Sequence, residues 1–525
     1  MQRLVGPILH LKQGDPQTWR FTVSVWARRE RRAPRANQLT LTFDSTSQAT
    51  VDPTPRDAGG FHDGRWLIWN VSIPRRTAEL EASYRLEGFT DGAVEVDRVV
   101  VPAVDQAPRV AFFSCNGVQH PEDWTTQPEM ERLWNRMYER HNAPENPDGS
   151  AGPYHVLVGG GDQLYCDRIW SDVPELQALN TWEKRQQAKV RPALRREIEE
   201  MYASFYARWR VSWSADLLAR VPGLYIWDDH EIFDGWGSYE EDLQQSEVFQ
   251  AIFAVAQKAF MLFQLGGDLR PGRSLCLDPQ GGHFLQAVHF PGQLDVLALD
   301  LRSQRTQGQV MAETQWSALK TYLQNREAAG GASPHLLVVS SVPVVYLNFA
   351  AAEKFLDWLP WRQGLEDDLR DQWESPAHQE ERARLIMTLF DHAKAAQSRV
   401  TILSGDVHVG ARGRITSRRP EHLLGQETEE VMHQLTSSAI VYPPPKALYL
   451  AGMRVIAKEG PVEISAISHV ATEVVPLGAR HFLLGQNNWL SIEPDPAWPS
   501  SRQQLWVRWV TEDGDVPPPL VIRPR

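Results

Sequence analysis

The chain has 525 residues, of which 42% are hydrophobic and 23% charged, an ordinary composition for a soluble globular protein. Its length is too great for one compact core, so we expect at least two domains. The net charge of −12 argues against a nucleic-acid-binding surface as the main feature of the protein. The 20 tryptophans predict aromatic packing in the core and at interfaces rather than sugar or membrane binding.

The cysteines and the first residues bear on the cellular compartment. Cys115, Cys166 and Cys276 are too few for a disulfide framework, which is compatible with a reducing compartment. Residues 1–7 lack the apolar core of a signal peptide, and no segment reaches membrane-spanning length. We therefore expect no membrane association and a cytoplasmic location for the chain as given, or an exported protein if a leader has been removed. The oligomeric state is not predicted.

Residues 1–105 have the pattern of an all-β domain. Apolar and polar residues alternate in several short runs that Gly- and Asp-rich turns separate, which is typical of a small β-sandwich. These runs lie at residues 19–25, 39–43, 66–73, 79–86 and 94–101. They contain no cluster of metal-ligand residues, so we expect this domain to serve packing or to restrict access of substrate.

Residues 106–525 change to an alternation of strands and helices, and we expect them to form an α/β or α+β catalytic domain. Predicted strands lie at residues 110–113, 155–158, 223–226, 296–299, 336–339 and 399–403, and after Val441 at 481–484, 489–492 and 504–510. Predicted helices lie at 128–140, 181–218 and 243–265, with a further helical segment marked by Leu365, Leu369, Leu385 and Leu389. Glu427, Glu429 and Glu430 are expected in a solvated loop.

Metal-seeking residues follow several of these strands. Such residues are Cys115, Asp162 with Tyr165, Asp228 to Glu231, and Asp406 with His408. Because ligands of open α/β sheets bind beyond the carboxyl ends of the strands, we expect these side chains to converge on one site. The sequence therefore predicts a metallohydrolase.

The types of donor atom restrict which metals fit. A thiolate from Cys115 and a phenolate from Tyr165, whose ordinary pKa is about 10, favour a strongly acidic metal such as ferric iron. The aspartates favour a second, harder cation such as calcium or magnesium. Asp162 is the natural bridge between the two, and paired metals suit hydrolysis by in-line displacement at phosphorus.

Each candidate also has a structural interpretation. Cys115 can be an inert buried thiol, and Tyr165 a core aromatic residue. Asp228 and Glu231 can cap or hydrogen-bond a turn, and Arg302 and Arg305 can form ordinary ion pairs. Asn116 is a weaker candidate for the site. For the residues that could line its entrance, the structural interpretation is preferred: these are Asp167, Asp234, Trp236 and Asn348.

Four motifs in this order resemble the PhoD-like alkaline phosphatases of the metallophosphoesterase superfamily. They are Gly161-Asp162-x-x-Tyr165, Trp227-Asp228-Asp229-His230-Glu231, Leu299-Asp300-Leu301-Arg302 with Arg305, and Ser404-Gly405-Asp406-x-His408. The resemblance extends from about Arg109 to the last residue. It implies a four-layer αββα sandwich preceded by a small N-terminal β-sandwich, and a site for Fe³⁺ plus Ca²⁺ or another hard divalent cation.

The resemblance also implies roles for single residues. Metal ligands would be Cys115, Asp162, Tyr165, Asp229, Asp406 and His408, with Asp162 as the bridge and Cys115 and Tyr165 on iron; His230 would assist the leaving group, and Arg302 and Arg305 would bind phosphate. No residue is predicted to bind another cofactor. The expected activity is hydrolysis of a small phosphomonoester or phosphodiester. The alternatives are a phospholipase-D-like diesterase on the same site and a non-catalytic, metal-stabilised binding protein.

Overall fold

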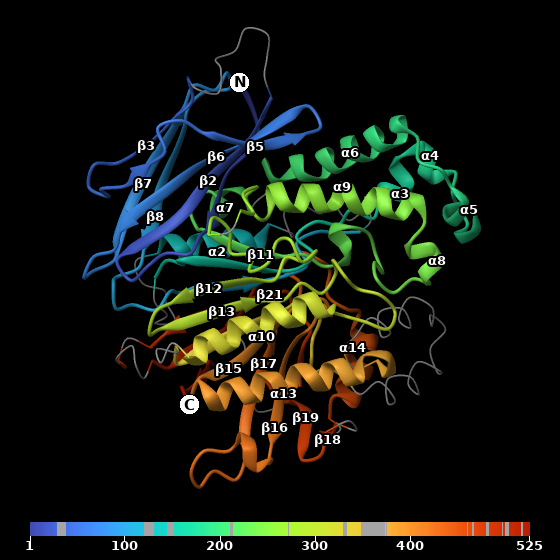
Figure 1. Cartoon of the computed structure of the whole chain (residues 1–525). Coiled ribbons are helices and arrows are strands. Elements are labelled where there is room, and N and C mark those ends of the chain that lie inside the picture. The colour runs from blue at the N-terminus through green and yellow to red at the C-terminus, as the bar shows by residue number, and fades with distance from the viewer. Residues whose placement is uncertain are drawn as a thin grey trace.

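The computed structural model describes residues 1–28, 38–119, 131–143, 152–210, 214–270, 272–328, 333–347, 373, 375–458, 460–464, 467–478, 482–495, 497–498, 503–515 and 518–525 (Figure 1). Asn348 and the predicted helical positions Leu365 and Leu369 lie outside these residues. Among the described residues, no helix combines the length and the hydrophobicity needed to cross a membrane.

The first of two large sheets has 12 strands and contains both ends of the chain. Its order is β23 (Gly514–Asp515), β22 (Leu505–Thr511), β21 (Asn488–Pro494), β9 (Val110–Phe113), β10 (Val156–Gly160), β11 (Gly223–Ile226), β1 (Gln2–Leu11), β2 (Thr18–Arg28), β6 (Gly64–Pro74) and β4 (Thr50–Val51). Beside this path, β24 (Leu520–Ile522) pairs with β22 and β5 (Arg56–Phe61) with β6. Strands β9, β10 and β11 are parallel to one another, so their carboxyl ends lie at one edge.

The second large sheet has 9 strands. Its order is β12 (Gln286–Phe290), β13 (Leu294–Ala298), β14 (His335–Ser340), β15 (Arg399–Ser404), β17 (Glu430–Thr436), β16 (Gly410–Ser417), β19 (Val470–Val475) and β18 (Val462–Glu463), with β20 (Leu483–Leu484) beside β16. Strands β13, β14, β15 and β17 are parallel. A separate sheet of three strands contains β3 (Thr40–Phe43), β7 (Leu80–Glu87) and β8 (Val94–Val101).

Helices cover the outer faces of both large sheets, which confirms the predicted four-layer αββα arrangement (Figure 1). Helices α2 (Arg132–Asn142), α6 (Pro192–Ala207) and α9 (Glu247–Phe263) pack on the first sheet, and α10 (Glu313–Ala328) and α13 (Gln379–Ala395) on the second. The shorter helices are α3 (Ile169–Asp172), α4 (Pro174–Gln177), α5 (Trp182–Gln187), α7 (Ala215–Leu218), α8 (Glu241–Gln244) and α14 (Ala447–Ile456), with 3-10 turns η3 (Arg208–Arg210), η4 (Asp229–Glu231), η5 (Pro376–His378) and η6 (Pro420–His422).

The alternation of side chains along the strands produces these layers. In β10, Leu157 packs in the outer core with α6 and α9, whereas Val156 and Val158 face the core between the sheets. In β14, Leu336 packs with α10 and α13, and Leu337 faces inward. Both faces of each strand are therefore apolar, which explains why these strands read in the sequence as continuous hydrophobic runs.

The N-terminal strands extend the first large sheet rather than forming an isolated unit. β1, which the sequence did not predict, pairs with β2 and is parallel to β11, with His10 opposite Gly223. The three-stranded sheet shares the core between the sheets with β2 and β6. An N-terminal β-sheet region is thus confirmed, whereas a domain division between residues 1–105 and 106–525 stays a prediction. The expected core role of tryptophan is confirmed, because eight tryptophans are among the largest fully buried side chains of the described residues.

Candidate metal centre

The predicted ligands lie on tight turns at the carboxyl ends of strands from both large sheets. Cys115 follows β9, Asp162 follows β10, and Asp406 and His408 follow β15. All four have a positive φ, of 52°, 55°, 70° and 53° respectively. Residues other than glycine are uncommon in this left-handed region, and such strain persists where the surrounding structure imposes it, often at functional sites. The turns therefore place polar side chains where regular strands would not.

Four aspartates form what we term the carboxylate cluster: Asp162, Asp228, Asp229 and Asp406. Ligand atoms of Asp162, Asp228 and Asp406 all lie within 4.8 Å of one another. Ligand atoms of Asp162, Asp229 and His230 form a second group of the same size. Asp162 belongs to both groups, which is the arrangement expected of a residue that bridges two cations; the bridging role itself stays a prediction.

The environment of Asp162 fits a bound cation. Its side chain is buried, and Oδ1 has no hydrogen-bond partner among the described residues. Burial and the neighbouring carboxylates of Asp228, Asp229 and Glu231 raise the pKa of Asp162 well above its ordinary value, against the opposing charge of His230. Because a buried carboxylate in such surroundings is costly unless a positive charge compensates it, the residues present fit a metal ion.

Glu231 holds the loops of the centre together. Its carboxylate accepts hydrogen bonds from the backbone N–H groups of Asp162 at 2.9 Å, Gln163 at 2.6 Å and Asp228 at 2.9 Å. With the side chain of Asp228 it forms a capping box on η4, which confirms the structural interpretation of this glutamate. Burial raises the pKa of Glu231 to about 8 despite these hydrogen bonds. Glu231 is thus a positioning residue for both aspartate loops.

Arg302 lies behind the carboxylates. It is fully buried, its Nε is paired with Asp228 Oδ1, and its Nη2 lies 3.4 Å from Asp229 Oδ1. It also donates to the backbone oxygen of Trp236 at 3.0 Å. Ser341, at the end of β14, donates to the same oxygen of Asp228 at 2.9 Å. These contacts orient two members of the carboxylate cluster, whereas the predicted phosphate contact of Arg302 stays a prediction.

Arg305 is buried next to Gly237. A Cβ at Gly237 would lie 2.6 Å from Arg305 Cγ, and Gly237 has a φ of +97°, so only glycine fits the chain at this point. The arginine stem therefore packs directly on the backbone of the loop that follows η4. Its predicted contact with phosphate stays a prediction.

A second group of side chains, which we term the aromatic stack, lines the other side of the centre: Tyr165, His230, His408 and Tyr442. The ring of Tyr165 stacks on His230 with centroids 4.2 Å apart, and Tyr442 stacks on His408 with centroids 4.0 Å apart. The hydroxyl of Tyr165 lies 3.4 Å from His408 Nε2. The structure thus brings together two predicted ligands, Tyr165 and His408, from the two sheets. Tyr442 had no signal in the sequence.

Cys115 lies against both groups. Its thiol donates to Asp162 Oδ2 at 3.5 Å, and burial together with Asp162 and Asp406 raises its pKa well above the ordinary value. Burial, Cys115 and Asp162 raise the pKa of Tyr165 in the same way. Both groups would bind a metal as anions, so they require a cation acidic enough to displace their protons. Burial, followed by the charge of His230, lowers the pKa of His408 to about 3, which leaves a neutral imidazole suited to a metal.

His230 is oriented by a carboxylate that the sequence ranked low. Its Nδ1 lies 2.9 and 3.0 Å from the two oxygens of Asp167, and Asp167 also accepts from the backbone N–H of Asp234 at 2.7 Å. Burial opposes a charge on His230, but Asp167, Asp229 and Asp162 outweigh it and hold the pKa well above its ordinary value. The available signal was a second aspartate in the loop of Asp162. In contrast, Asn116 accepts from Trp134 at 2.9 Å, a structural role.

Comparisons with known proteins identify a family and similar folds. The profile of a family described as PhoD related phosphatase matches residues 129–360 and 362–474. The uncharacterized protein YGR266W of Saccharomyces cerevisiae is 26% identical over 537 residues, covering 85% of this chain and 74% of the yeast protein.

Two solved structures are also similar. A structure of PhoD has a TM-score of 0.52 at 13% identity and covers 97% of this chain and 92% of its own; at this identity the likeness concerns the fold. GAP50, described as the anchor in the inner membrane complex of Plasmodium, has a TM-score of 0.36 at 10% identity and covers 80% of this chain and 90% of its own.

Proposed function

The chain belongs to the PhoD-related phosphatase family, and from this premise we propose that it is a metal-dependent phosphoester hydrolase. The observation that carries the proposal is the position of Asp162, whose ligand atom lies within 4.8 Å of those of Asp228 and Asp406 and whose Oδ2 also accepts from the Cys115 thiol, because a shared carboxylate is how two cations are held close together. The substrate that we propose is a small phosphomonoester or phosphodiester.

The donor set supports Fe³⁺ together with Ca²⁺ or another hard divalent cation. Cys115 and Tyr165 would hold the iron, and the oxygens of the carboxylate cluster, with Asp162 shared, would hold the harder cation. His408 lies within 3.4 Å of the Tyr165 hydroxyl and would join the ligands of the iron. When bound, such a pair lowers the pKa of water and neutralises charge on a phosphate.

The protein's own residues supply the remaining functions. His230 would hold a proton for the leaving oxygen, because Asp167 occupies its Nδ1 and leaves Nε2 as the nitrogen available to substrate. Burial opposes a charge on His230, but Asp167, Asp229 and Asp162 raise its pKa, which favours the protonated form. Arg302 would hold Asp228 and Asp229 in position, and Arg305 is the arginine that we propose for the phosphate.

The proposal is tested by assay and elemental analysis of one untreated preparation. We expect iron plus a hard divalent cation, turnover of 4-nitrophenyl phosphate or bis(4-nitrophenyl) phosphate, and loss of both activities with a chelator. Active protein that contains no metal would overturn the proposal. Bound metal without turnover of either ester would favour a metal-stabilised binding protein, and a strong preference for the diester would favour the diesterase alternative.

A further inference from the structure

A charged side chain outside the metal centre is held between two tryptophans. The guanidinium carbon of Arg185, in α5, lies 3.9 Å from the ring centre of Trp170 and 4.7 Å from that of Trp182. Its Nε donates to the backbone oxygen of Leu179 at 3.0 Å. Trp182 itself is 55% exposed, which is unusual for so large an apolar side chain. We term Trp170, Trp182 and Arg185 the Arg185 clamp.

The guanidinium of Arg185 has no carboxylate partner in the part of the chain that the structure describes. This differs from other arginines nearby: Arg168 pairs with Asp172 at 2.5 Å, and Arg191 with Glu175 at 2.9 Å. Stacking on indole rings fixes the plane of the guanidinium but leaves the N–H groups at its edge able to donate. A fixed guanidinium loses little freedom on binding an anion and matches a phosphate with two parallel hydrogen bonds.

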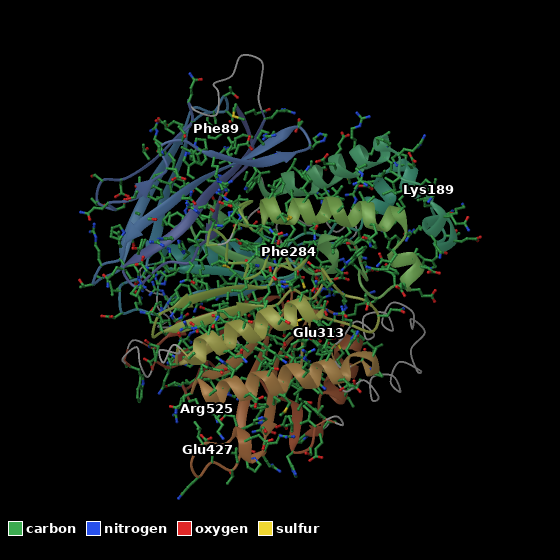
Figure 2. The ribbon with its side chains drawn as sticks, viewed as in Figure 1. Phe89, Lys189, Phe284, Glu313, Glu427 and Arg525 are labelled. Atoms are coloured by element: carbon green, nitrogen blue, oxygen red, sulfur yellow. The ribbon has the colours of Figure 1, made fainter. Side chains whose placement is uncertain are left out.

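The clamp is connected to the metal centre by the loop that follows η4. Trp182 packs on Tyr239 with ring centres 5.5 Å apart, and the hydroxyl of Tyr239 donates to the backbone oxygen of Asp234 at 2.6 Å. The backbone N–H of Asp234 donates to Asp167, which orients His230. α5 lies toward the edge of the molecule, where Figure 2 labels Lys189. A continuous series of contacts through Tyr239, Asp234 and Asp167 therefore connects the clamp to His230.

We propose that the Arg185 clamp is a second anion subsite, which binds a distal phosphate group of an extended substrate whose scissile phosphoester lies at the metal centre. The inference rests on the proposed function, because it assigns the substrate class of the same site. These contacts connect the clamp to His230, which we propose to assist the leaving oxygen. The distal phosphate therefore belongs to the leaving alcohol. The site thus selects phosphoesters whose leaving alcohol is long and carries a second phosphate.

A series of substrates measures both the preference and the distance. The α,ω-bisphosphates of linear alkanediols of increasing length are compared with the alkyl monophosphates of the same lengths. For the unaltered protein, we expect the ratio of kcat/KM between the two series to pass through a maximum at one length. In Arg185→Met, which keeps the stem but not the charge, we expect this maximum to fall about tenfold through KM, the order expected for a hydrogen-bonded charge.

The matched control is Lys184→Met, which removes a positive charge from the neighbouring position of α5, where Lys184 donates to Asn180 at 2.8 Å. It should leave the maximum in place, and alkyl monophosphates should be hydrolysed equally by all three proteins. No preference at any length, or a preference unchanged in Arg185→Met, overturns the subsite; an equal loss in Lys184→Met overturns it in favour of general charge attraction. Absence of turnover in both series overturns the subsite, and it refutes the proposed function as well only if bis(4-nitrophenyl) phosphate is also not hydrolysed.

Discussion

The two ends of strands β9 and β10 carry charged clusters of similar composition that are completed in different ways. At the amino ends, Arg109 donates its backbone N–H to His155 Nδ1 at 2.9 Å, and His155 Nε2 lies 3.0 Å from Glu79. Arg109 also forms an ion pair with Glu79 and donates to the backbone oxygen of Pro153 at 2.7 Å. One cation, one anion and a neutral imidazole thus satisfy one another.

At the carboxyl ends, the same two strands lead to Cys115 and Asp162, where the negative charges are not all compensated by positive ones. Asp228 and Asp229 share the guanidinium of Arg302, whereas Asp162 Oδ1 has no hydrogen-bond partner among the described residues. The comparison shows what separates a structural charge cluster from a binding site in this fold. In the structural cluster, each charged group has a partner within the protein. In the carboxylate cluster, a buried carboxylate oxygen has none among the described residues, so the cluster fits an added positive charge.

The largest expected effect is that of Asp162→Asn. Removing the charge shared by both donor groups should lower kcat/KM for a chromogenic phosphate ester by about a thousandfold, the scale of losing a central electrostatic contact. The variant should remain folded, because relief of repulsion with Asp228 and Asp229 offsets the lost charge. The measurements are steady-state turnover, metal content and thermal unfolding.

The control for that variant is Asp216→Asn, since this aspartate is 71% exposed and pairs with Arg220 at 3.4 Å. Its activity should equal that of the unaltered protein. Full activity of Asp162→Asn would contradict the view that the carboxyl ends of the strands carry a binding site and the amino ends only a structural cluster.

An intermediate effect is expected for Asp167→Asn. Without its charged partner, His230 should be a weaker acid catalyst, so turnover of an alkyl phosphate should fall about ten- to a hundredfold, as for other residues that orient a functional group. Turnover of 4-nitrophenyl phosphate should change much less, because 4-nitrophenolate departs without a proton. Asp172→Asn, in the neighbouring helix α3, is the control. Equal losses with both substrates would show that Asp167 serves the fold rather than the proton.

At the opposite end of the strands, Glu79→Gln should affect stability and spare catalysis. It breaks the ion pair with Arg109 and weakens the contact with His155, which should cost about 2 kcal/mol, a value reduced because Glu79 is 33% exposed. Denaturant unfolding measures the loss, and kcat of the folded variant should be unchanged. Glu81→Gln provides the comparison, because Glu81 is 60% exposed and pairs with Arg98 at 3.1 Å. A loss of activity without a loss of stability would connect the two ends functionally.

The last expected effect concerns pH and appears only in acid. Burial, followed by the charge of Arg109, lowers the pKa of His155 to about 3, against 6.5 for the ordinary group. Below pH 6.5, His155 therefore binds a proton in the unfolded chain but not in the folded protein. The free energy of unfolding consequently falls as pH drops from 6.5 toward 3. The lowered pKa of Glu79 adds to this loss below pH 4.5. His155→Gln should reduce the slope of stability against pH by up to about 1.4 kcal/mol per unit; an unchanged slope would contradict a neutral His155.

Much of the candidate centre was predictable because the buried parallel strands are continuous apolar runs that end at polar residues. That pattern alone placed Cys115, Asp162, Asp229 and Asp406 at strand ends, and the structure brings them together. One local prediction was wrong: Glu430, expected in a solvated loop, is buried at the start of β17 and pairs with Arg399 at 2.6 Å. Its partner lies in another strand, so the sequence around Glu430 gave no indication of burial.

The sequence by itself therefore determined the buried strands, their alternation with helices and the donor types of the centre, since these depend on local alternation and on which residues follow each strand. Only the tertiary structure decided how those donors are held. β1 joined the N-terminal strands to β11, Glu231 linked two loops through their backbone N–H groups, and Arg302 turned inward to the aspartates. Asp167 and Arg185 likewise acquired their partners from packing. Such contacts join residues far apart in the chain, and their energy depends on burial and direction, which spacing along a sequence does not encode.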